Sequence, residues 1–304
     1  MRTEDLSQFV AVARAGSIAA AAEQLGVSQP TLSKSLARLE RAMRVTLLER
    51  HARGVRLTPT GRAVLEHAQR VDLGIRDAFA AARDLRQGVA GFVRVGVGVG
   101  IPQALVSAAC ASALAASRIE LEVQGGMSDS LYRAVAAGET DFTVAGVRPP
   151  RERGLSWRPL FADPMIAIAH RSHRLAAART VTWETLAQQT WITANVGTMT
   201  RGWFEQQFVE RNLPPPAHVV GLRGFPFTYD LGRQLGALML VPASTARVPR
   251  DRGDFVVIRR PGDWRSDRVV GILSRAGGYA NPAALTLMAS FADAAAQLFA
   301  KPAR

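Results

Sequence analysis

The stretch from Ser28 to Met43 constrains the fold most, because it specifies a helix with two chemically different faces. Ser28 can cap the helix, since its hydroxyl can accept a hydrogen bond from a first-turn N–H group, and Pro30 is tolerated in that turn. One face carries apolar residues at spacings of four, three and four: Leu32, Leu36, Leu39 and Met43. The opposite face is cationic, with Lys34, Arg38 and Arg41. The pattern predicts a helix that packs on its leucines and offers a basic face to a polyanion such as DNA.

Two shorter helices are predicted before this stretch. The first has an apolar face and ends at Gly16, and Ser17 then caps an alanine-rich helix that ends at Gly26. The second and third helices together indicate a helix-turn-helix, whose second helix enters the major groove of DNA. The residues expected at base edges are Gln29, Pro30, Thr31, Ser33 and Lys34, and those expected at phosphates are Arg38 and Arg41.

A β-hairpin is predicted after the helices. Two short extended runs, 45–50 and 55–58, flank a turn that contains Gly54, which indicates a wing beside the helix-turn-helix. Leu47 and Leu57 are expected to anchor the hairpin on the helices. The arginines expected to reach the flanking DNA backbone or minor groove are Arg50, Arg53 and Arg56.

The charge of this region supports a DNA partner. The segment from Ser28 to Arg62 contains eight lysines and arginines but only two glutamates. The net charge of the whole chain, +13, is weaker evidence, because only two of its 38 cationic residues are lysines and such a bias can reflect genome composition. A local excess of +6 in a short segment fits a phosphate backbone better. The alternative is a solvated basic surface.

A long helix is predicted from Pro59 to about residue 88. It carries an apolar seam at alternating spacings of four and three, which is a heptad pattern: Val64, Ala68, Val71, Ile75, Ala78, Ala82 and Leu85. We expect this seam to pair two copies of the chain, because readers of inverted repeats need two half-sites about one helical turn apart. A helix packed on its own domain is the alternative.

These blocks resemble the N-terminal signature of LysR-type transcriptional regulators. The residues that carry the resemblance are 17–25, 28–33, Leu39–Glu40 and 57–61, at matching spacings. The chain departs from the usual Leu-Gly and Leu-Phe at Met43–Arg44 and Leu47–Leu48. The variant formed by Leu47–Leu48, Arg53–Val55 and Leu57–Thr58 is similar to the subgroup of toluenesulfonate, protocatechuate and galactose-binding-protein regulators. The resemblance implies a tetramer, a dimer of dimers, and an effector domain with two subdomains like those of periplasmic binding proteins.

The rest of the chain alternates predicted strands and helices, which indicates an α/β fold with mostly parallel sheets. The expected fold class is thus α/β: an N-terminal winged helix-turn-helix, a long linker helix and a C-terminal two-subdomain effector domain. The expected domains are 1–58, 59–88 and 91–304. Subdomain I comprises 91–161 and 268–304, and subdomain II comprises 162–267, with crossings near Arg158–Phe161 and Gly262–Asp267.

In open α/β sheets, ligands bind beyond the carboxyl ends of the strands. The residues expected there are Val99, Gly100, Ile101, Met127, Ser128, Asn195, Thr198, Met199, Phe225 and Phe227. The hydroxyls and neighbouring N–H groups at Ser128 and Thr198 could hold a carboxylate or sulfonate, although simple helix capping explains them equally well. We therefore expect an aromatic or anionic co-inducer.

The remaining composition narrows the function. A single cysteine, Cys110, fits a reducing compartment, and no apolar run suggests a membrane span, so a cytoplasmic protein is expected. No cofactor and no metal site are expected. The predicted partners are double-stranded DNA with an inverted repeat, a small-molecule effector, further copies of the chain and RNA polymerase. The alternatives are an architectural DNA binder with a degenerate, ligand-free cleft and an α/β enzyme with a basic N-terminal domain.

Overall fold

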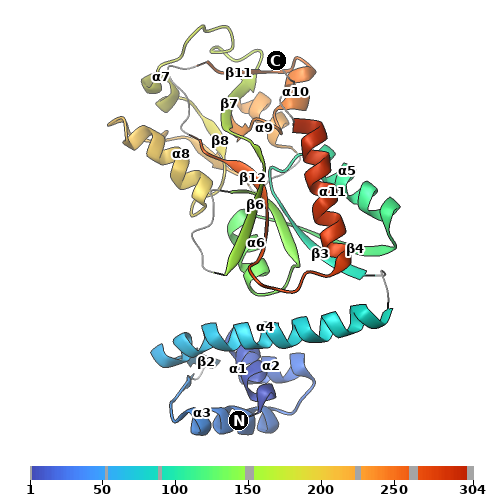
Figure 1. Cartoon of the computed structure of the whole chain (residues 1–304). Coiled ribbons are helices and arrows are strands. Elements are labelled where there is room, and N and C mark those ends of the chain that lie inside the picture. Colours follow the sequence, from blue (N-terminus) through green and yellow to red (C-terminus); the bar gives the residue numbers. More distant parts are fainter. Residues whose placement is uncertain are drawn as a thin grey trace. The chain divides into compact units, whose positions relative to one another are not determined.

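The computed structural model describes residues 2–51, 54–87, 91–147, 154–222, 227–259 and 266–299. The chain forms two compact units, Met1–Gln87 and Gly88–Arg304, and each is described by itself (Figure 1). The side chains of Arg50, of residues 83–87 and of residues 248–249 lie outside the description. Within the described ranges, no helix is both long enough and apolar enough to cross a membrane.

The first unit contains the three predicted helices, the predicted hairpin and the long helix. Its elements are α1 (Thr3–Ala15), α2 (Ile18–Leu25), α3 (Gln29–Met43), β1 (Leu48–His51), β2 (Gly54–Leu57) and α4 (Pro59–Gln87). The predicted caps are confirmed: the Ser28 hydroxyl accepts the Thr31 N–H at 3.3 Å, and the Ser17 hydroxyl accepts the Ala20 N–H at 3.4 Å. The predicted apolar face of α3 is confirmed too, because its three leucines are buried against α1 and α2.

A buried carboxylate joins α1 to α3. The Asp5 side chain is fully buried, and its oxygens accept hydrogen bonds from the Ser35 hydroxyl at 2.6 Å and from Arg38 Nε at 3.0 Å. A second guanidinium nitrogen of Arg38 completes a bidentate ion pair, and the Arg2 N–H also donates to the carboxylate. Donation from Arg38 is the main reason why the pKa of Asp5 lies well below its usual range, although burial opposes it. Asp5 is therefore charged at neutral pH.

The wing is fixed to the helices by polar contacts to backbone groups. The Glu40 carboxylate accepts the Leu47 and Leu48 N–H groups at 2.7 and 3.2 Å, and the Thr58 hydroxyl donates to the Thr46 carbonyl at 2.8 Å. At the other end, Gly54 has a φ of +135° and lies so close to the α1–α2 turn that a side chain would collide with backbone there. The Glu40 and Gly54 positions therefore set where the wing sits.

The second unit contains two five-stranded sheets. The first sheet has the order β4-β3-β5-β12-β6, with strands β3 (Gly91–Gly98), β4 (Ile119–Gly126), β5 (Phe142–Val147), β6 (Leu155–Ala162) and β12 (Val269–Arg275). Helices α5 (Gln103–Ala116) and α11 (Pro282–Phe299) share its main apolar core with β3, β5 and β12. Helix α6 (Ser128–Ala136) contributes to a separate small cluster with β5 and β12.

The second sheet has the order β11-β7-β10-β8-β9, with β7 (Met165–His170), β8 (Trp191–Thr193), β9 (Val219–Gly221), β10 (Leu238–Pro242) and β11 (Phe255–Val257). One core contains aromatic residues of α7 (Trp183–Ala187) and α8 (Met199–Val209). A separate core includes residues of α9 (Thr228–Leu235). The short helix α10 (Arg247–Asp251) precedes β11.

The sheets are mixed, whereas mostly parallel sheets were predicted. In the first sheet β3 runs parallel to β4 and β5, but β12 runs antiparallel to both β5 and β6. In the second sheet β8 runs parallel to β9 and β10, but β7 runs antiparallel to β10 and β11. The antiparallel strands are those next to the crossings, because there the chain passes into the other sheet instead of returning through a helix.

The crossings meet at a buried ion pair. The chain leaves the first sheet after Ala162, just beyond the crossing expected near Arg158–Phe161, whose residues still pair with β12, and it returns at Val269. Most of the other predicted crossing lies outside the described residues. Asp163 and Arg268, at the two crossings, form an ion pair with side chains only 1% and 14% exposed. Asp163 also accepts the N–H and hydroxyl of Ser244 at 2.9 and 2.8 Å.

We predict that Asp5→Asn lowers the free energy of unfolding of the first unit by about 2 kcal/mol at pH 7, since hydrogen bonds to charged groups are worth roughly 1.5–3 kcal/mol. The folded-state pKa of Asp5 is depressed, so its stabilisation is present above about pH 4, the unfolded-state value, and is lost as the pH falls further. The difference between the variant and the parent should therefore shrink below about pH 4.

The measurement is urea unfolding followed by far-ultraviolet circular dichroism from pH 7 down to pH 3. All five tryptophans lie in the second unit, so their fluorescence provides an internal reference that Asp5→Asn should leave unchanged. Glu23→Gln, at an exposed position of α2, is the matched control. A constant difference at all pH values would contradict the assignment of Asp5.

We predict that Asp163→Asn destabilises the second unit by about 3 kcal/mol, because removal of one partner leaves the other charge buried and uncompensated. Tryptophan fluorescence during urea unfolding measures this unit alone. The control is Asp251→Asn, which removes an exposed pair with Arg247 at 3.8 Å and should change stability by less than about 0.5 kcal/mol. Equal effects of the two substitutions would argue against the buried pair as the anchor of the crossings.

Candidate DNA interface and effector pocket

The outer face of α3 is polar and accessible. Gln29, Pro30, Thr31 and Lys34 are exposed, and Ser33 is half-buried. The Thr31 hydroxyl lies 2.7 Å from that of Ser28, so it is already engaged at the helix start. Gln29 and Lys34 therefore offer the accessible amide and ammonium groups that can reach base edges.

Arg38 has a structural role that the sequence analysis missed. Its guanidinium forms an ion pair with Asp5 of α1, although 41% of the Arg38 side chain is exposed to solvent. The expectation of a phosphate contact assumed that Arg38 was unpaired. The signal that could have revealed the pair is a lone aspartate on the first helix, within an otherwise apolar face. Arg41 is exposed and donates to the Ala37 carbonyl at 3.2 Å.

The wing presents one described arginine. Arg56 is exposed on β2, opposite Glu49 of β1. The Arg50 side chain and Arg53 lie outside the described residues, so their predicted contacts stay predictions. Leu47 is buried and Leu57 packs against the same core, as predicted for the hairpin anchors.

Some residues of the predicted seam on α4 pack in the core of their own unit, and others are exposed. Ala68 is buried and Val64 packs in the core of its own unit, so these two positions support the fold of one chain. Val71, Ala78 and Ala82 are exposed and Ile75 is half-buried. Phe79 is 74% exposed, although it was not among the predicted seam residues. The side chain of Leu85 lies outside the description. The exposed apolar stretch of α4 therefore begins at Val71.

In the first subdomain, the predicted effector residue Gly100 contacts Arg268. Val99 is exposed and Ile101 is buried in the core of the first sheet. Between them Gly100, with a φ of +90°, accepts a hydrogen bond from Arg268 at 3.3 Å through its carbonyl oxygen. Ser128 opens α6 and donates to the Gly146 carbonyl at 3.2 Å, while Met127 is the N-cap residue.

In the second subdomain, two buried polar atoms lie at the end of β8 and just after it. The Asn195 amide oxygen and the Thr193 hydroxyl have no hydrogen-bond partner among the described residues. Thr198 caps α8, accepts the Arg201 N–H at 3.3 Å and donates to the Asn195 carbonyl at 2.7 Å. Met199 and Phe227 are exposed, and Phe225 lies outside the described residues.

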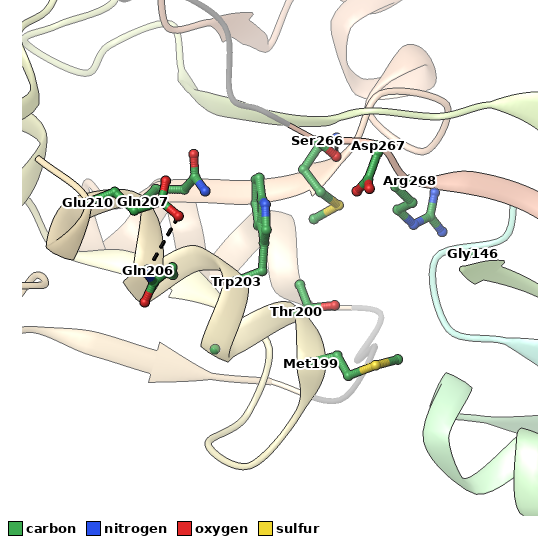
Figure 2. Close-up of a pocket in the computed structure, with 12 residues that line it drawn as sticks. Gly146, Met199, Thr200, Trp203, Gln206, Gln207, Glu210, Ser266, Asp267 and Arg268 are labelled. Atoms are coloured by element: carbon green, nitrogen blue, oxygen red, sulfur yellow. Dashed lines mark hydrogen bonds between the residues drawn. The ribbon is translucent and has the colours of Figure 1, made fainter. Parts of the chain in front are cut away.

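A pocket with a volume of about 620 Å³ lies along α8, next to the crossing that ends at Arg268 (Figure 2). It is lined by Gly146, Met165, Met199, Thr200, Gly202, Trp203, Gln206, Gln207, Glu210, Ser266, Asp267 and Arg268. Of the predicted effector residues that the structure describes, Met199 lies in this lining. Gly146 and Arg268 also contact Ser128 and Gly100, so the pocket adjoins the predicted cleft. Sequence patterns missed the rest, because α8 was expected to contribute only its first turn.

The glycines after β3 are explained by close packing. A side chain at Gly96 would collide with the Thr143 hydroxyl, and one at Gly98 would press on Ala145 of β5. These glycines therefore let β3 and β5 pack together. Cys110 packs against the first core, and burial raises the pKa of its thiol.

Comparison with known proteins gives matches over nearly the whole chain. Residues 3–62 match the bacterial regulatory helix-turn-helix of the lysR family, and residues 86–296 match the LysR substrate binding domain. The RuBisCO operon transcriptional regulator of Allochromatium vinosum is 29% identical over 206 residues, which cover 68% of each chain. The regulator GbpR of Azospirillum brasilense is 28% identical over 72% of this chain and 65% of its own.

A solved structure shows the same fold. Full-length OxyR of Pseudomonas aeruginosa superimposes with a TM-score of 0.66 at 23% identity, over 96% of this chain and 98% of that one. The two domain matches account for both units described above. The chain therefore belongs to the LysR family of transcriptional regulators, with an N-terminal DNA-binding helix-turn-helix and a C-terminal effector-binding domain.

Proposed function

We propose that α3 reads an inverted-repeat operator through Gln29 and Lys34, with Pro30, Thr31 and Ser33 beside them at the bases. The single observation that carries this proposal is the two-sided burial of α3: its leucines are buried and its amide and ammonium side chains are exposed. Glutamine suits a bidentate pair to adenine, and lysine suits guanine. Phosphate contacts come from Arg41 and from the wing arginines Arg50, Arg53 and Arg56. Arg38 instead anchors α3 to α1 through its ion pair with Asp5.

The proposed assembly is a homodimer through α4 that pairs into a dimer of dimers. Support comes from the exposed apolar residues Val71 and Phe79 on a helix of 29 residues. Exposed apolar side chains of this size favour a partner that removes them from water. Two copies of α3 held by one helix pair can then occupy half-sites about one turn of DNA apart.

The proposed ligand is a small-molecule co-inducer held in the α8 pocket and the adjoining cleft. The Asn195 amide oxygen, which has no hydrogen-bond partner among the described residues, supports a polar ligand in the adjoining cleft, because buried polar groups normally find hydrogen-bond partners. The pocket volume falls within the roughly 300–1,000 Å³ that is usual for small-molecule sites. Binding would shift the population toward one arrangement of the two subdomains and so alter the spacing or bend of the bound DNA.

We place the protein in the cytoplasm and propose RNA polymerase as a further partner. The proposed function includes no enzymatic activity. An architectural DNA binder with an unused cleft is the second candidate, favoured by the exposed apolar side chain of Val99 after β3. A ligand that raises the melting temperature of the second unit would exclude that candidate, because binding to the folded state stabilises it.

We predict that Gln29→Ala and Lys34→Ala relax base preference, each at one position of the half-site, by about 1–3 kcal/mol of discrimination. Arg56→Ala should instead weaken operator and random duplex about equally and lower the salt slope by about one. The measurement is competition binding on the DNA upstream of the gene, against single-base variants and random duplex at several salt concentrations. Equal losses on operator and random duplex for Lys34→Ala would contradict its place at a base.

We predict that Phe79→Glu weakens self-association at least tenfold, since it buries a charge in an apolar seam. The parent position is 74% exposed, so the fold of one chain should be unaffected and helix content unchanged. Sedimentation equilibrium over a concentration series measures association. The control is Glu66→Lys, at an exposed position on a different face of α4 from Phe79. An unchanged dimer constant in Phe79→Glu would exclude this stretch of α4 from the interface.

A further inference from the structure

The α8 pocket contains a buried acceptor that the protein leaves unused. Gln207 is only 3% exposed and lines the pocket, yet its amide oxygen has no hydrogen-bond partner among the described residues. A buried acceptor without a partner lowers stability, so a structural glutamine at this position is unfavourable compared with an apolar residue of the same shape. The position therefore fits a residue that is satisfied by a ligand.

The charges of the lining favour a cation. Glu210 and Asp267 place two exposed carboxylates around the pocket, and the Glu210 carboxylate accepts a long hydrogen bond from Gln206 at 3.5 Å (Figure 2). The cationic lining residue Arg268 is already paired with the buried Asp163. The described lining therefore carries more negative than positive charge, which opposes the anionic ligand that the sequence suggested.

An arginine just after α8, Arg211, has its charge engaged by other groups. The Arg211 guanidinium donates to the backbone carbonyl of Gln207 at 2.6 Å and stacks over the Trp183 ring at 4.0 Å. Its charge is therefore engaged by a backbone carbonyl and by the ring of Trp183, which does not line the pocket. Trp203, one turn before Gln207, supplies a wide apolar wall, and Figure 2 shows its ring between Gln207 and the crossing residues Ser266 and Asp267.

We propose that the α8 pocket binds an organic cation, whose ammonium or amidinium N–H group donates to the Gln207 amide oxygen while its apolar body lies against Trp203. The exposed Glu210 carboxylate supplies the long-range attraction. This inference rests on the proposed co-inducer function and names the chemical class of the ligand. A planar apolar group near an indole ring, with its cationic end toward an acceptor, uses each described feature of the lining.

The test is isothermal titration of the full-length protein with a matched pair of probes, phenethylamine and phenylacetate, which differ in the sign of the charge. The parent protein should bind phenethylamine at least tenfold more tightly. Gln207→Leu keeps the volume and removes the acceptor, so it should weaken phenethylamine binding about tenfold or more. The same substitution should leave the melting temperature of the ligand-free protein unchanged or higher, which a structural glutamine would not do.

Two further variants separate the contributions. Glu210→Gln should weaken phenethylamine binding about threefold and reduce its salt dependence, because this carboxylate is exposed and screened. Glu205→Gln, on the same helix but paired with Arg201 outside the lining, is the control and should bind phenethylamine like the parent. Glu210→Gln also provides a test if Gln207→Leu does not fold.

Tighter or equal binding of phenylacetate, binding of neither probe, or an unchanged affinity in both pocket variants would overturn the inference. Binding of upstream DNA is measured on the same preparations. A protein that binds that DNA but shows no preference for the amine would refute the cationic ligand alone, whereas a protein that does not bind the DNA would refute the proposed function.

Discussion

The buried carboxylate of Asp5 holds the DNA-binding unit together. It lies at the centre of bonds from Arg38 and Ser35 of α3 and from the Arg2 backbone, so it fixes α1 against α3 where leucines alone could slide. Apolar packing supplies most of the stabilisation of such a small unit, but it is not directional. The charged hydrogen bonds supply direction, and the orientation of α3 determines which side chains face outward.

The effector domain uses a similar device. Asp163 is almost fully buried at one crossing, and Arg268 reaches it from the other crossing, more than a hundred residues later in the chain. Ser244 of the second subdomain binds the same carboxylate, and Gly100 of the first accepts from the same guanidinium. The place where the two subdomains could move relative to each other is thus also where their polar contacts are concentrated. A ligand in the adjoining pocket would therefore lie next to the crossings that join the two subdomains.

The sequence predicts the elements with strong periodicity or clear caps, and it fails where contacts depend on distant residues. Helices α1 to α4 and the wing follow from apolar spacing and from Ser17, Ser28 and Thr58. Short elements such as β8, β9 and α7 carry too few residues for a periodic signal and were not predicted. The antiparallel course of β12 was also missed, because strand direction depends on which sheet the chain enters.

Site residues follow the same division. Gln29 and Lys34 were predicted to contact bases because they lie near the start of α3 and away from its apolar face, and both are exposed in the structure. Arg38 looked the same in sequence, but its pairing with Asp5 requires a fold that brings together residues thirty-three apart. Gln207 gave no sequence signal at all, because its significance lies in burial without a partner. Polar residues buried by the fold are therefore the ones that periodicity misjudges.

Methylation interference on the upstream DNA tests the central claim, that an anchored α3 enters the major groove as one of a symmetry-related pair. Methyl groups at guanine N7 lie in the major groove. The account predicts interference at two sites about 10 base pairs apart, or a multiple of that distance, with the guanine signal lost in Lys34→Ala. Interference confined to adenine N3 in the minor groove, or a single unpaired site, would contradict it.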